Sequence, residues 1–169
     1  TQDSDAGEAY RELGMLADAE AVYRRAVEAA QRMGLSTVES IASANLGLLV
    51  AQQGSLDEGA SILRQLLLRK EGLNRRVEGF AHCSYARVLC MRNQLGEARH
   101  HAGLAIVALE AMPPLQPMAY AVLSQIELAA GREQEALNAA RAAGDLLERL
   151  GQVEEGEVLV RLTLAEALL

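Results

Sequence analysis

The sequence predicts an all-α fold, an α-solenoid of antiparallel helical hairpins with about nine helices. Three observations predict it. Half of the 169 residues are apolar but only 3% are aromatic, so the core must be aliphatic. Leu and Ala dominate this apolar half and the three prolines all lie between Pro113 and Pro117, which favours helix over strand elsewhere. The third observation is a short turn that recurs along the chain.

The recurring turn is found four times, as GMLADA at 14–19, GSLDEG at 54–59, NQLGEA at 93–98 and GREQEA at 131–136. Its opening residues lie 40, 39 and 38 residues apart. A nearly constant interval of this length is typical of repeat architectures. Amphipathic segments flank each copy, so we interpret the turn as the joint between two helices of a hairpin.

Each joint opens with a residue that tolerates the left-handed conformation ending a helix, namely Gly14, Gly54, Asn93 and Gly131. Five residues later stands a small residue, where two antiparallel helices must approach closely: Ala19, Gly59, Ala98 and Ala136. Ser36 with Glu39, and Ser55 with Glu58, have the spacing of a capping box. The predicted units are four repeats, at 1–34, 35–72, 73–112 and 113–151, and the first helix of an incomplete fifth repeat at 152–169.

The pattern resembles the tetratricopeptide repeat (TPR) family. The family places a Leu-Gly or similar pair in the first helix, a glycine at the joint, and then Ala, an aromatic residue and Ala in the second helix. One copy here comprises Leu46, Gly47, Gly54, Gly59, Leu63 and Leu66, and another Ala6, Gly7, Tyr10, Gly14, Ala19, Tyr23 and Ala26. The chain departs from the family at Glu127, where a large apolar residue is usual, and its period exceeds 34 residues. A HEAT-like array has a compatible period and stays an alternative.

The resemblance implies a right-handed superhelix whose first helices line a concave face, as in the helical-repeat regions of bacterial signalling and regulatory proteins. Carried across by alignment, the partner-binding positions are Ile41, Ala44, Leu48, Gln52, Phe80, Cys83, Arg87, Met91, Met118, Ala121, Gln125, Leu128, Val160 and Leu164. The face is mostly apolar. It lacks the Lys and Asn residues with which chaperone-binding relatives hold a terminal carboxylate.

Two interpretations of this face compete. In one, it accepts an amphipathic helix or a peptide from a protein partner, with Arg87, Gln125 and Glu157 fixing the register. In the other, its residues pack on neighbouring helices. A separate alternative is a structural arm that self-associates, or docks on a catalytic or DNA-binding domain of its own parent protein. The edge for such association would be the last helix, through Val158, Leu159, Leu162 and Leu169.

Composition argues against other classes of partner. A net charge of −7 disfavours nucleic acid, which needs a concentrated basic surface. No apolar run reaches the length of a membrane span and no leader pattern is present. Two cysteines seven residues apart on a helix are too distant for a disulfide, which suits a reducing cytoplasm. Fifteen arginines against one lysine suggest a GC-rich bacterial genome, and we expect the chain to be an excised piece of a larger protein.

No catalytic, cofactor or metal motif is evident. His82 and Cys83 are adjacent and therefore point apart on a helix, and so do His100 and His101, so we expect one packed and one solvated histidine there. The basic stretch at 69–76 is expected to be a solvated loop. Phosphate-binding, nucleophile-elbow and zinc-protease signatures are missing, and the thiols are expected to be inert. We therefore expect a non-enzyme without cofactors.

Overall fold

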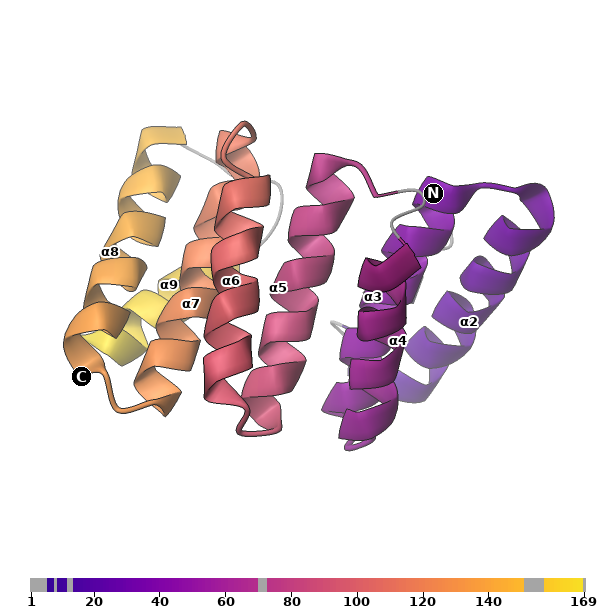
Figure 1. The fold of residues 1–169 in the computed structure, drawn as a ribbon, viewed down its shortest axis with the longest axis horizontal. Helices are drawn as coiled ribbons and strands as arrows, with labels where there is room; N and C mark the ends of the chain where they lie inside the picture. Colours follow the sequence, from indigo (N-terminus) through magenta and orange to yellow (C-terminus); the bar gives the residue numbers. More distant parts are fainter. Residues whose placement is uncertain (1–5, 8, 12–13, 70–72, 151–156, 169) are drawn as a thin grey trace.

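The computed structural model describes residues 6–7, 9–11, 14–69, 73–150 and 157–168 (Figure 1). Every regular element in these ranges is a helix. Residues 6–7 and 9–11 are helical, and the later elements are α2 (Leu16–Met33), α3 (Ser36–Gln52), α4 (Leu56–Arg69), α5 (Arg75–Met91), α6 (Leu95–Ala108), a 3₁₀ turn η1 (Pro113–Leu115), α7 (Gln116–Ala129), α8 (Glu133–Leu150) and α9 (Glu157–Ala167). The predicted all-α solenoid is confirmed.

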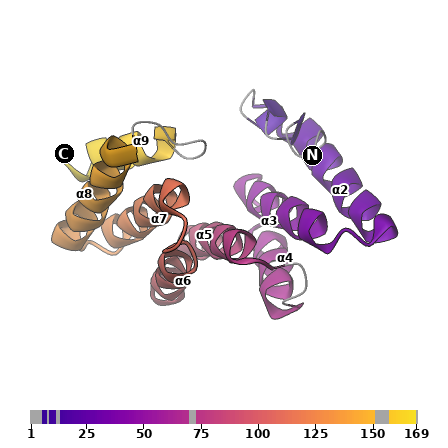
Figure 2. The same ribbon diagram turned by 90° about the horizontal axis from the view of Figure 1, so that it is seen from above.

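The helices form two rows that curve together (Figure 2). We call α3, α5, α7 and α9 the inner row, and α2, α4, α6 and α8 the outer row. Successive inner helices pack directly on one another, whereas within the described residues no extensive packing joins α4 to α6 or α6 to α8. Because the inner helices lie closer together than the outer ones, the stack bends toward the inner row. The fold therefore presents a hollowed inner side.

The four predicted joints have the expected backbone. Gly14, Gly54 and Gly131 have φ of 74°, 102° and 69°, and Asn93 has φ of 60°. In the part of the chain that is described, Asn93 is the one non-glycine residue with a left-handed backbone conformation. Asparagine tolerates this conformation better than most residues. Gly34, which the turn pattern does not include, is also left-handed and ends α2. Left-handed residues thus lie just before α2 and in the short joints that follow α2, α3, α5 and α7.

One capping prediction is wrong. Ser36 is the first residue of α3 rather than its cap; Leu35 holds the cap position and no side chain caps the helix there. Glu39 instead accepts hydrogen bonds from Gln31 at 3.0 Å and from Arg69 at 2.7 Å. These partners come from α2 and α4, so Glu39 links three helices. Capping spacing in the sequence cannot reveal such competing partners.

The small residues after each joint lie where two helices cross. Ala19, Ala98 and Ala136 have no exposed surface, and Gly59 is buried. A Cβ atom added at Gly59 would come within 2.4 Å of the carbonyl oxygen of Gly47. The α3–α4 crossing is therefore a backbone-to-backbone contact that admits no side chain.

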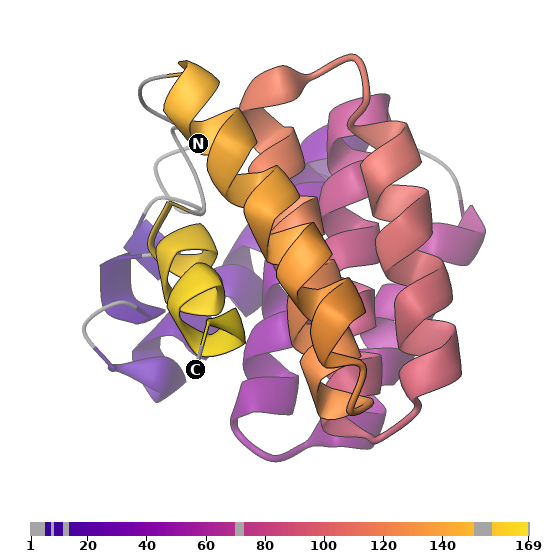
Figure 3. The ribbon, with the colours of Figure 1, turned by 90° about the vertical axis from the view of Figure 1, so that its left-hand side faces the viewer.

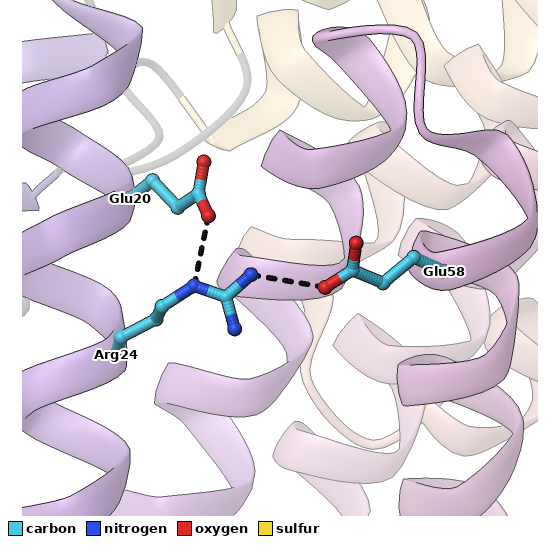
Figure 4. A network of polar contacts seen from close by, with 3 residues as sticks. All are labelled: Glu20, Arg24 and Glu58. Carbon is cyan, nitrogen blue, oxygen red and sulfur yellow. Dashed lines mark hydrogen bonds and ion pairs between the residues drawn. The ribbon is translucent and has the colours of Figure 1, made fainter.

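A surface ion pair also connects α2 to α4, across the joint between two hairpins (Figure 4). Arg24 of α2 bonds to Glu20 on its own helix at 2.8 Å and to Glu58 of α4 at 2.9 Å. The hydrogen bonds to Glu20 and then Glu58 raise the pKa of Arg24. Since all three side chains are well exposed or partly exposed, this contact orients the helices but adds little stability.

The last helix closes one end of the stack. α9 packs on both α7 and α8 (Figure 3), and it buries Val160 and Thr163. Leu162, two residues after Val160, faces away from it and is 52% exposed, and Leu168, directly after the end of α9, is 62% exposed. Of the predicted edge residues, Leu159 is partly buried, Leu169 lies outside the described residues, and so does the side chain of Val158. Across the described helices, none is both long and apolar enough to cross a membrane.

Candidate functional site

The inner row contains the fourteen predicted partner-binding residues, but they differ in exposure. Five are buried between helices: Ala44, Leu48, Cys83, Ala121 and Val160. Seven are partly buried: Ile41, Phe80, Arg87, Met118, Gln125, Leu128 and Leu164. Gln52 and Met91 are exposed. The first five serve helix packing, as one of the two interpretations expects, and the candidate ligand surface narrows to the other nine.

A pocket of about 360 Å³ lies on the inner row between α5, α7 and α9. Four of the predicted residues line it: Arg87, Met91, Gln125 and Leu128. Its other lining residues are Cys90, Val122, Ile126 and Glu166. The volume falls within the range typical of ligand-binding pockets. The structure thus gathers into one place residues that the sequence could only assign to separate helices.

Helical spacing explains why these side chains meet. Arg87, Cys90 and Met91 are three and four residues apart in α5 and therefore share one face. Val122 and Gln125 do the same in α7, three residues apart. The buried side chains of Val122 and Ile126 form the apolar base, while Met91, 42% exposed, stands toward solvent.

Arg87 is the principal charge of the pocket. It is partly buried, and no carboxylate or other acceptor bonds its guanidinium among the residues that the structure describes. Burial lowers its pKa, the positive charge of Arg11 lowers it further, and Cys83 opposes these effects. An arginine remains charged even so, because its ordinary pKa is far above neutral pH. The pocket therefore holds a partly desolvated cation without a counter-ion in the described ranges.

Two further polar side chains face this cation's pocket. Gln125 contributes an amide that can donate and accept, and it makes no hydrogen bond within the described structure. Glu166 of α9 is exposed and lines the pocket without pairing with Arg87. The combination is apolar walls with a few convergent polar groups, as is usual in binding sites.

The thiols near the pocket are poor nucleophiles. Burial raises the pKa of Cys83 to about 12 and also raises the pKa of Cys90. Both are free cysteines, as the spacing predicts. A thiol that stays protonated at neutral pH neither attacks a substrate nor binds a metal readily. Cys90 therefore contributes apolar surface to the pocket.

The histidines form a separate cluster between α5 and α6. His101 is partly buried, with Nδ1 2.9 Å from Nδ1 of His82 and with its ring edge-on to Tyr85, whereas His100 is exposed. The prediction of one packed and one solvated histidine is confirmed. The His82 contact was missed, because it depends on how two helices are rotated against each other. In the described segments no group of three or more potential ligands is placed to hold a metal ion.

The basic stretch at 69–76 is used partly for structure. Arg69 pairs with Glu39, and Asn74 caps α5 by accepting a hydrogen bond from the Val77 amide at 3.0 Å. Positions 70–72 lie outside the described residues. The Asn74 cap was not predicted, although a capping residue directly before a helical pattern is a usable signal.

Sequence reasoning also missed Glu166 as a pocket residue. Alignment assigned the inner face of the last helix to other positions, including Val160 and Leu164. Val160 is buried against the stack instead, and Glu166 lies at the pocket. The rotation of α9 about its own axis decides this, and the repeat alignment does not fix that rotation.

Comparison with known proteins identifies the architecture. The structure is similar to a kinesin light chain-like protein of Podosopora anserina built of nearly identical TPR-like repeats, with 16% identity and a TM-score of 0.68, and to a single-substitution variant of that protein, with 15% identity and a TM-score of 0.69. Both matches cover 98% of this chain and 83% of the other. No protein-family model and no curated protein sequence matches the chain. The chain has a TPR-like fold.

Proposed function

We propose that this protein is a non-catalytic interaction module that binds a peptide or an amphipathic helix along its inner row. The observation that carries the proposal is the inner pocket, which combines apolar walls with Arg87 and Gln125, neither of which has a bonding partner in the described structure. Curved helical stacks offer extended surfaces of this kind to partners. Met91 adds a flexible, polarisable side chain at the surface, which suits contact with an apolar ligand.

The proposed setting is the cytoplasm of a bacterium, in a larger signalling or regulatory protein. Two free thiols fit a reducing compartment, and fifteen arginines against one lysine fit a GC-rich genome. Nucleic acid does not enter the proposal, since the net charge is −7.

The direct test is selection of peptides from a displayed library, followed by affinity measurement with two variants of the protein. Met91→Asp places a charge beside the pocket and should weaken the selected peptides at least tenfold. Val107→Asp is the matched control: Val107 is 59% exposed on the outer helix α6, so the same change there should leave affinity unchanged.

The two variants should unfold at nearly the same temperature as the parent, since both side chains are exposed. A library that yields no binder, or binders weakened equally by both variants, would refute the inner-row site.

A second candidate function is a structural arm that self-associates through α9. The observation favouring it is the exposure of two leucines, Leu162 on α9 and Leu168 directly after the end of that helix. Light scattering over a wide concentration range tests it. A dimer that Leu162→Asp dissociates and Met91→Asp does not would support this function, and a monomer at all concentrations would exclude it.

A further inference from the structure

The arginine of the inner pocket differs from other partly buried arginines of the described chain. Arg92 pairs with Asp57, and Arg132 pairs with Glu127. Those acids belong to the helix or turn beside each arginine. Arg87 is partly buried like Arg92 and Arg132, yet within the described ranges no acid reaches it. The chain therefore partly desolvates one cation without compensating it.

Partial burial of an uncompensated charge costs free energy, and a protein recovers that cost when an opposite charge arrives. A carboxylate suits the guanidinium fork, which can donate two parallel hydrogen bonds to it. Because the pocket excludes part of the surrounding water, such a pair would be stronger there than on an open surface.

The other residues that line the pocket indicate which group of the ligand would lie beside the carboxylate. Val122 and Ile126 form a buried apolar base, and Met91 and Leu128 border it. A free inorganic anion would leave this surface uncovered, whereas an acidic residue next to an apolar one would fill both parts. Gln125 can donate its amide to the ligand's backbone or carboxylate.

We propose that the ligand of this pocket is a peptide or helix segment in which one Asp or Glu pairs with Arg87 while a neighbouring apolar side chain packs on Met91 and Leu128. This inference rests on the proposed function and specifies its partner. Glu166 lines the same pocket and acts as a competitor from the chain's own last helix. Its carboxylate repels the incoming acid and lowers affinity without preventing binding.

The experiment uses a displayed library of helical peptides in which Asp, Glu, Asn, Gln, Lys and Ala are equally frequent at the polar positions. Peptides selected on the protein should be enriched in Asp or Glu at one position. A selected peptide and its Glu→Gln or Asp→Asn counterpart are then measured by fluorescence anisotropy against the parent protein and three variants. These are Arg87→Gln, Glu166→Gln and, as a charge-matched control, Arg141→Gln, which alters an exposed arginine of the outer helix α8.

The acidic peptide should lose about tenfold or more in affinity when its acid becomes an amide. Arg87→Gln should produce the same loss for the acidic peptide and almost none for the amide peptide, so that the two changes are not additive. Glu166→Gln should raise affinity for the acidic peptide about threefold, and Arg141→Gln should change nothing.

Three results would overturn the inference. Peptides that bind with no acidic preference, while Met91→Asp still weakens them, would remove the role of Arg87 and leave the inner-row site standing. Equal weakening of acidic and amide peptides by Arg87→Gln would show a general structural effect. A library without binders would remove the proposed function together with this inference.

Discussion

The α3–α4 and α7–α8 hairpins close by different chemistry at equivalent positions. In the first, Gly47 and Gly59 bring two backbones together, and nothing larger than hydrogen fits at Gly59. In the second, Ser124 stands where Gly47 stands in the earlier hairpin, and its buried hydroxyl donates to the Ala136 carbonyl oxygen at 2.8 Å. A repeat can therefore keep its crossing by omitting side chains or by bonding a polar one. The second solution requires every buried polar atom to find a partner.

Glu127 extends this polar solution. Its side chain is 2% exposed and accepts from Arg99 of α6 at 2.8 Å and from Arg132 at the α7–α8 joint. The family resemblance expects a large apolar residue there. The carboxylate instead joins α6, α7 and the α7–α8 joint.

The largest expected effect comes from removing both arginines around Glu127. The double change Arg99→Gln and Arg132→Gln leaves a buried carboxylate without its counter-ions and should lower the free energy of unfolding by about 3 kcal/mol. Urea unfolding followed by circular dichroism measures it. Adding Glu127→Leu to that double variant should restore most of the loss, because an apolar side chain needs no counter-ion. A double variant as stable as the parent would contradict this account.

Gly59→Ala tests the glycine crossing of α3 and α4. The added methyl group would meet the Gly47 carbonyl oxygen and the Ala51 side chain, so unfolding should become easier by about 2 kcal/mol. Gly96→Ala is the matched control: it lies in α6, where nothing stands within 4 Å of the added Cβ, so it should stabilise the protein by up to about 1 kcal/mol. The thermal unfolding temperatures of both variants test this prediction. Equal changes in unfolding temperature would argue against a close contact between α3 and α4.

Ser124→Ala tests the hydroxyl at the α7–α8 crossing. The change removes the buried hydrogen bond to the Ala136 carbonyl oxygen. It should lower the free energy of unfolding, measured with urea, by about 1.5 kcal/mol. Ser61→Ala, whose hydroxyl accepts from Gln65 near the surface, should cost almost nothing. If the two substitutions had the same effect, the Ser124 hydroxyl would not be part of the crossing.

The α5–α6 hairpin adds a pH-dependent contact that the other two lack. Burial lowers the pKa of His82 to about 4, and burial followed by the charge of His82 lowers that of His101 to about 4. A depressed pKa means that the folded state holds neutral rings, so this stability is complete above the unfolded pKa near 6.5 and is lost as the pH falls toward 4. We expect a loss of about 1 kcal/mol between pH 7 and pH 5, discounted because His101 is partly solvated.

His101→Phe should flatten this pH dependence, as measured by urea unfolding at each pH, while His100→Phe should change it less, because burial is the larger cause of both lowered pKa values and the charge of His100 a smaller one. His100 is the matched control because it is exposed beside His101. A pH profile unchanged by His101→Phe would show that other groups cause the acid sensitivity.

The sequence alone was sufficient for the repeated part of the fold. Gly54 and Asn93 could be assigned to joints, because left-handed backbone strongly restricts the residue type and short-range periodicity fixes the helices on each side. Ala98 and Gly59 could be assigned to helix crossings because a small residue recurs five positions after the opening residue of each joint. The placement of Arg87 and Gln125 on an inner face followed from the family resemblance. Their partial burial and their meeting in one pocket could not be predicted from the sequence.

What the chain dictates locally is the alternation of helices and joints, since backbone conformation and helix amphipathicity depend on neighbours within a few residues. Contacts between helices depend instead on the rotation and offset of each helix in the stack. That is why Glu39 bonds to α2 and α4 rather than capping its own helix, why His82 meets His101, and why Glu166 lies at the pocket. Burial, pairing and the pocket itself arise only when side chains far apart in sequence compete for the same space.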